Sequence, residues 1–218
     1  LVAIWGLFDF KAFARIGRVN RRDGMVAGLT FVSTLILAPH LATGILLGVL
    51  LSVAFQMVRM MRPHLAVLGR HPDGTMRDVR RHQLVPDPDI LTIRFDGRLI
   101  FTNAAHFEES LLEARAEFPG RKAVLLVAEG INEIDSSGEA MLRQVTGELR
   151  RQKIPFALAR VKWPVGEVLR RSGLEALIGA DRIYPTAEAA MEGLRALVGA
   201  PAARGEAPAN GATGKGMA

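Results

Sequence analysis

The stretch that decides the fold runs from KAVLLVA (122–128) through IDSSG (134–138) to IPFALA (154–159). A continuous apolar run of strand length is typical of a strand buried on both faces of a sheet. Between the two apolar runs, residues 136–152 repeat apolar side chains at the spacing of one helix face, with Met141, Leu142, Val145 and Leu149 inward. This strand-helix-strand order predicts parallel strands covered by helices, an α/β fold.

The flanking sequence continues the same alternation. Asp96-Gly97 is a tight-turn dipeptide, which predicts a hairpin between strands at 90–95 and 98–101. Asn103 is a favourable N-cap for a helix to Glu117, with Phe107, Leu111, Leu112 and Ala114 on one stripe. Further strands are predicted at 79–85 and 182–184, and further helices at 164–172 and 186–198. The sum is a mixed sheet that begins with a hairpin and continues with strand-helix-strand units.

The N-terminal part has a different character. Between Gly24 and Val58 there is no Asp, Glu, Lys or Arg, and His40 is the one titratable side chain. The run exceeds the roughly 20 residues of one membrane span, and Pro39 interrupts helix near its middle. It predicts a transmembrane hairpin of two helices, 25–38 and 41–60. One kinked span with an extracytoplasmic C-terminal domain is the alternative, and basic residues on both flanks favour the hairpin.

These patterns give five segments. Residues 1–23 are predicted to be the end of a preceding helix and a basic interfacial segment, and residues 24–60 the transmembrane hairpin. Residues 61–78 are predicted as a linker, 79–199 as the α/β domain, and 200–218, rich in Ala, Gly and Pro, as a disordered tail. The chain starts at Leu1 in what resembles a helix in mid-course, so we expect it to be a piece of a longer membrane protein.

Several classes of function are disfavoured. The chain has no cysteine, which excludes disulfides and thiolate-based metal or redox sites. The 28 Lys and Arg exceed the 22 Asp and Glu, and clusters at 11–22 and 59–81 flank the apolar run. Nucleic-acid binding would instead place basic residues on a folded face among aromatic residues, so no nucleic-acid partner is expected. No GxGxxG, P-loop or GxSxG motif is present, and the five histidines lack zinc-site spacing. We therefore expect no enzyme activity, no cofactor and no metal.

A family resemblance adds to this interpretation. The segment 134–138 between strand and helix, the later Leu169-xx-Ser172-Gly173-Leu174 and the short strand at Ile183-Tyr184 resemble the STAS domain. That domain is shared by anti-sigma-factor antagonists and the cytoplasmic tails of SulP-type anion transporters. Upstream, the segments 18–23, 44–49, 62–63 and 68–70 resemble the last two transmembrane helices and the linker of SulP proteins. One departure is Ala42-Thr43, where the family pattern has an acidic residue.

The resemblance implies the C-terminal part of a SulP secondary transporter for sulfate or a related anion such as bicarbonate. It places the chain in the inner (plasma) membrane as a multi-pass protein with a cytoplasmic STAS domain that regulates transport and assembly. The implied partners are membrane lipid, the rest of the transporter bundle, a second copy in a homodimer and a regulatory protein on the STAS face. The transported anion would be bound by helices outside this chain, so no substrate residue is assigned. The alternative is a membrane-tethered signalling switch of the anti-sigma-factor-antagonist type.

Asp135, Ser136 and Ser137 are the candidate regulatory residues. In the antagonists, a serine at this position is phosphorylated, and the resemblance assigns that role to Ser136 first. A phosphate there would lie at a helix N-terminus, where free N–H groups favour negative charge. The alternative is that the segment is simply an N-cap, which stabilises a helix by about 1 kcal/mol.

Overall fold

The computed structural model describes residues 24–25, 28–29, 31–32 and 41–199, and the chain forms two compact units, Leu1–Pro63 and His64–Ala218. In the first unit, α4 (Leu41–Met61) agrees with the helix predicted at 41–60. The predicted turn at Pro39-His40, the interfacial segment 1–23 and the tail 200–218 lie outside the described residues. Among the helices in the described part of the chain, none combines the length and the apolar character needed to cross a membrane. The predicted transmembrane hairpin is therefore not confirmed.

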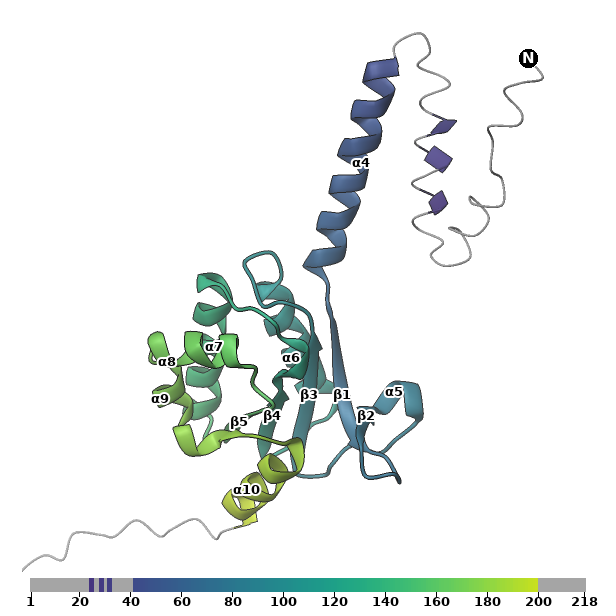
Figure 1. The fold of residues 1–218 in the computed structure, drawn as a ribbon. Helices are drawn as coiled ribbons and strands as arrows, with labels where there is room; N and C mark the ends of the chain where they lie inside the picture. Colours follow the sequence, from purple (N-terminus) through teal and green to yellow (C-terminus); the bar gives the residue numbers. More distant parts are fainter. Residues whose placement is uncertain (1–23, 26–27, 30, 33–40, 200–218) are drawn as a thin grey trace, which may run out of the picture. The chain divides into compact units, whose positions relative to one another are not determined.

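The second unit is built on one six-stranded sheet of order β2-β1-β3-β4-β5-β6 (Figure 1). β1 pairs antiparallel with both β2 and β3, whereas β3, β4, β5 and β6 pair in parallel, so the mixed sheet of the predicted α/β fold is confirmed. The strands are β1 (His64–Arg70), β2 (Met76–Asp78), β3 (Ile90–Asp96), β4 (Ala123–Val127), β5 (Phe156–Ala159) and β6 (Ile183–Tyr184).

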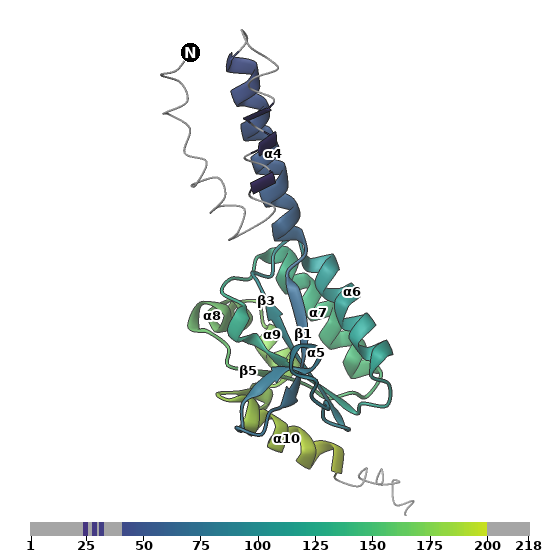
Figure 2. The ribbon, with the colours of Figure 1, turned by 90° about the vertical axis from the view of Figure 1, so that its right-hand side faces the viewer.

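Helices cover both faces of the sheet (Figure 2). One core contains apolar side chains from β3, β4 and β5 together with those of α6, α7, α8 and α9, and the core on the other face is closed by α10. β4 lies between these cores with every residue buried, as the run at 122–128 predicted. The helices are α5 (Val79–His82), α6 (Ala104–Glu117), α7 (Ser136–Arg151), α8 (Trp163–Arg171), α9 (Leu174–Ile178) and α10 (Ala187–Gly199), with short 3₁₀ turns η1 (Ala128–Gly130) and η2 (Ala180–Arg182).

The start of the second unit differs from the sequence prediction. Residues 61–78, expected to be a linker, contain β1 and β2, and the strand predicted at 79–85 is replaced by α5. The cause is Asp78, whose Oδ1 accepts hydrogen bonds from the backbone N–H groups of Arg80 (2.8 Å) and Arg81 (3.2 Å). This capping turns the chain into a helical turn where β-branched and apolar residues suggested extension.

The hairpin predicted at 90–101 is also wrong. Residues 98–101 do not form a strand; Leu99 makes a single parallel bridge to Ile134, with its N–H donating to Glu133 O at 2.9 Å. β3 already has β1 and β4 as neighbours, so no free edge is left for a hairpin partner.

In the helix that follows, α6, two side chains differ from their predicted roles. Asn103 is the N-cap residue of α6, as predicted, but its side chain makes no capping hydrogen bond. The side chain instead holds the preceding loop, accepting from Ile100 N (3.0 Å) and donating to Arg98 O (2.9 Å). Leu112 is exposed, because the buried stripe of α6 follows Phe107, Leu111 and Ala114 and the next residue points about 100° away.

Asp87 joins the loop before β3 to α10. Its carboxylate accepts from Asp89 N and Ile90 N at 3.0 Å and pairs with Arg195 at 2.7 Å. Burial opposes the charged carboxylate, but the hydrogen bonds from Arg195 and the two N–H groups outweigh it and lower the pKa of Asp87. A lowered folded-state pKa contributes stability above the unfolded pKa of about 3.9, and this contribution is lost as pH falls through the folded value.

We therefore expect Asp87→Asn to lower the free energy of unfolding at pH 7 by about 1–2 kcal/mol, measured by urea denaturation. The difference from the parent should shrink as pH falls below about 4, because the unfolded carboxylate is protonated first and the folded one at a lower pH. Asp89→Asn is the matched control, because Asp89 makes a surface ion pair with Lys122 that should contribute less than about 1 kcal/mol. Equal loss in the two variants would contradict the assignment.

Candidate functional site

The candidate site lies at the carboxyl edge of the parallel strands. β3, β4 and β5 run in the same direction, so the segments that follow them, 97–103, 128–135 and 160–162, start from one edge of the sheet. Ligand and partner sites of α/β sheets gather at such edges. The predicted regulatory residues Asp135, Ser136 and Ser137 lie here, at the start of α7.

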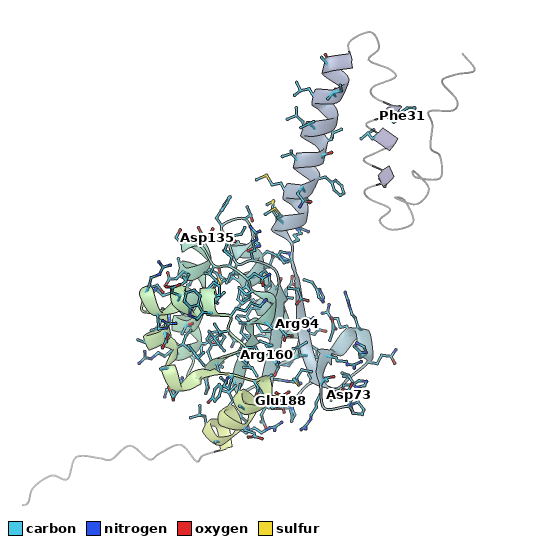
Figure 3. The ribbon with its side chains drawn as sticks, in the orientation of Figure 1. Phe31, Asp73, Arg94, Asp135, Arg160 and Glu188 are labelled. Atoms are coloured by element: carbon cyan, nitrogen blue, oxygen red, sulfur yellow. The ribbon has the colours of Figure 1, made fainter. Side chains whose placement is uncertain are left out.

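Asp135, labelled in Figure 3, is the N-cap of α7, and both of its carboxylate oxygens accept hydrogen bonds. Oδ1 accepts from Gly138 N at 2.8 Å, and Oδ2 accepts from Phe101 N at 2.9 Å. The first bond satisfies a free N–H of the helix. The second ties the segment after β3 to the helix that follows β4. Asp135 therefore joins two loops distant in sequence as well as capping α7.

The two serines occupy the first turn of α7. The side chain that caps the helix is that of Asp135. The capping role considered for the segment 134–138 therefore belongs to Asp135 and not to either serine. Ser136 is exposed and Ser137 is half-buried. Of the two hydroxyls, that of Ser136 is therefore the more accessible to a modifying enzyme.

Ion pairs surround this edge. Arg94 of β3 donates to both oxygens of Asp96 (2.7 and 3.0 Å) and lies 3.8 Å from Glu129, which pairs with Arg160 at 2.8 Å (Figure 3). The hydrogen bonds to Asp96 raise the pKa of Arg94, so its charge is fixed. The fold thus brings Glu129, directly after β4, between Arg94 of β3 and Arg160, which directly follows β5.

A further ion pair joins two segments of the candidate site. Arg98, directly after β3, lies 3.4 Å from Glu133, which precedes the cap residue Asp135. Both side chains are more than half exposed, so this pair contributes little stability. The carboxyl edge thus presents charge of both signs to a partner.

Two exposed aromatic side chains complete the edge, and sequence analysis missed both as candidates. Phe101 is 69% exposed in the segment after β3, and Trp163 is 71% exposed at the start of α8, directly after the β5 segment. Large aromatics are enriched at protein interfaces because they bury much apolar area at small entropic cost. Trp163 precedes the helix predicted at 164–172, so the apolar spacing of that helix does not include it. Phe101 lies in the strand predicted at 98–101, which does not form.

The site has the features of a docking surface. Its exposed groups are a serine hydroxyl, two aromatic rings and paired charges, and a phosphate on Ser136 would add about two negative charges beside Asp135. Within the described residues, no group of three or more His, Asp or Glu side chains is arranged to hold a metal ion. Modification and protein binding are the chemistry this arrangement supports.

Comparison with known proteins agrees with the fold. The STAS domain model matches residues 82–190. A probable sulfate transporter of Mycobacterium tuberculosis is 34% identical over 196 residues, covering 87% of the chain and 34% of that protein. A chloroplastic sulfate transporter of Arabidopsis thaliana is 28% identical over 194 residues, covering 84% of the chain and 28% of that protein. The chain therefore spans about a third of the length of the curated relatives it matches.

A solved structure shows the same fold. The murine Slc26a9 anion transporter in its inward-facing state matches with a TM-score of 0.73 at 16% identity, covering 84% of this chain and 30% of that one. The unit from His64 onward makes up less than three quarters of the chain, so this match also includes part of residues 1–63. The similarity is thus not confined to the α/β unit.

Proposed function

This chain belongs to the STAS domain family, and from that premise we propose that it is the C-terminal part of a SulP-type secondary anion transporter. The observation that carries the proposal is the 34% identity to a sulfate transporter of M. tuberculosis over 87% of the chain, which includes residues before the STAS unit. The anion is sulfate or a related anion such as bicarbonate, bound by helices outside this chain. The STAS unit regulates transport and assembly from the cytoplasmic side of the inner membrane, and the transporter works as a homodimer.

The surface of α4 supports a place for 24–60 in the membrane as a hairpin packed among other helices. Along the described part of α4, apolar side chains are exposed at almost every turn, an arrangement that requires lipid or protein neighbours. Burial is described for residues 42–58, 60 and 61 of α4, and among these the buried ones are Gly44 and Gly48, one turn apart. Small residues at this spacing allow close approach of another membrane helix. The most exposed apolar residues are Ile45, Leu46, Val49, Leu50, Val53 and Val58.

Ser136 is the regulatory residue in this proposal. Ser136 is exposed at the first turn of α7, next to Asp135, whose carboxylate accepts hydrogen bonds from two backbone N–H groups. A negative charge added to Ser136 would therefore act directly on the Asp135 carboxylate and on these two bonds. Phosphorylation would repel Asp135 and change the segment that carries Phe101. The same observation favours a second candidate, a membrane-tethered signalling switch in which Ser136 controls the docking of a partner and no anion is carried.

We expect Ser136→Glu, in the complete gene product that contains this chain, to change the initial rate of radiolabelled sulfate uptake at least threefold. The strain used should lack its own sulfate uptake. Ser136→Gln is the matched control, because it has the same size without the charge and should transport at the parent rate.

Three other outcomes separate the possibilities. No uptake of sulfate or bicarbonate by the parent protein, with a Ser136-dependent protein partner recovered instead, would favour the signalling switch. Uptake that is equal in the parent and both variants would remove Ser136 from regulation and leave transport in place. Equal changes in both variants would point to packing rather than charge.

A further inference from the structure

A pocket lies on the opposite side of the second unit from the candidate site. It has a volume of about 360 Å³ and is lined by residues of the C-terminal end of α7, the start of β5, α9 and η2. The volume falls in the range of pockets that hold small organic molecules. Ser136 starts α7, whereas this pocket lies at its end, so the two places are independent.

The polar lining of the pocket is mainly cationic. Arg150, Lys153 and Arg182 line it together with a single carboxylate, that of Asp181, an excess of two positive charges. None of these three cations has an ion-pair partner among the described residues. The other two arginines of α7 are paired, Arg143 with Glu139 and Arg151 with Glu148, so the unpaired arginine of this helix is the one that lines the pocket.

Arg182 gives the clearest sign of an absent acceptor. Its Nε is buried and has no hydrogen-bond partner in the part of the chain that the structure describes. A buried guanidinium N–H without an acceptor is costly and rare, so Arg182 has no protein partner that offsets this cost. Its Nε is closed off from solvent, and an anion would reach the side chain through the terminal guanidinium nitrogens. Arg182 lines the pocket, so an anion bound there would be within its reach.

The backbone at Lys153 has a conformation that favours glycine over lysine. α7 ends in a Schellman motif, with Ile154 N–H donating to Leu149 O (2.8 Å) and Lys153 N–H donating to Arg150 O (3.0 Å). The residue at Lys153 has φ +58°, a left-handed conformation in which glycine is most favourable. Glycine would fit this backbone conformation better, so Lys153→Gly removes a cation from the pocket lining without straining the end of α7.

The rest of the lining selects the kind of anion. Ile154, Pro155, Phe156 and Leu177 give the pocket an apolar wall. The three cations outnumber the one carboxylate of Asp181, which acts with the C-terminal end of α7 against a negative ligand. A doubly charged head gains more from this net positive lining than a singly charged one. A dianionic head attached to an apolar group therefore suits both the cations and the apolar wall. We propose that this pocket binds a small organic phosphate monoester, with the phosphate on Arg150, Lys153 and Arg182 and the organic part on the apolar wall.

The test uses phenyl phosphate as the probe and the complete chain purified in detergent, with binding measured by isothermal titration calorimetry. We expect saturable binding that weakens as salt is raised, since the contact is ionic. Lys153→Gly should weaken binding at least tenfold while leaving the melting temperature unchanged or higher, because glycine suits the backbone at this position. Arg182→Gln should weaken binding to a similar extent.

Arg151→Gln is the matched control, since Arg151 adjoins Arg150 but pairs with Glu148 and does not line the pocket. It should bind the probe as the parent does. Inorganic phosphate should bind at least tenfold more weakly than phenyl phosphate, and equal affinity would overturn the assignment of an organic ester. Absence of saturable binding by the parent chain, or unchanged binding in both pocket variants, would overturn the site itself. The result does not depend on whether the chain takes part in transport.

Discussion

Gly138→Ala is expected to lower the free energy of unfolding of the STAS unit by about 3 kcal/mol, although alanine is the better helix former. A Cβ on Gly138 would lie 2.1 Å from Leu99 O and 2.7 Å from Leu99 C. These are backbone atoms, held by the bonds from Leu99 N to Glu133 O and from Asp135 N to Leu99 O. The neighbour therefore cannot move aside without breaking the connection between the two loops of the candidate site.

Gly147→Ala is the matched control in the same helix. No described atom lies within 4 Å of a Cβ added there, so the same substitution should stabilise the unit by up to about 1 kcal/mol. Urea denaturation of both variants measures the contrast. If Gly138→Ala were as stable as the parent, the close approach of α7 to Leu99 would be wrong.

Asp135→Ala is expected to cost about 2–3 kcal/mol, because it removes two acceptors at once. One oxygen caps α7 through Gly138 N, and the other holds Phe101 N. Asp135→Asn retains one carbonyl oxygen and should lose about half as much, which gives a graded series for urea denaturation.

Hydrogen exchange separates the two bonds of Asp135. In Asp135→Asn we expect the amide of Phe101 to exchange faster while the amide of Gly138 keeps its protection, because the remaining oxygen can still cap the helix. Asp135→Asn as stable as the parent would show that the cap alone accounts for the effect, and equal stability of the two variants would show that the bond to Phe101 alone does. Protection of Phe101 in both would contradict its bond to Asp135.

Elements specified by short-range interactions were predicted correctly, and those that depend on distant partners were not. β4, α7 and β5 were predicted within about two residues because each is specified by its own apolar pattern. The segment 61–85 was not, since β1 and β2 are recognised as strands only through pairing with β3 and each other, and Asp78 redirects the chain after them. The Asp96-Gly97 turn signal was real as a local preference, but the sheet had no edge to receive a hairpin.

The sequence by itself determined that 122–159 forms a strand-helix-strand unit and that Asp135, Ser136 and Ser137 stand at its helix start, because periodicity and capping act over a few residues. Only the tertiary structure decided which of the three caps α7, that Phe101 and Trp163 are exposed at the same edge, and that Arg150, Lys153 and Arg182 line one pocket. These relations join residues many positions apart in the sequence. They depend on strand pairing and helix packing, which a pattern of neighbouring residues does not specify.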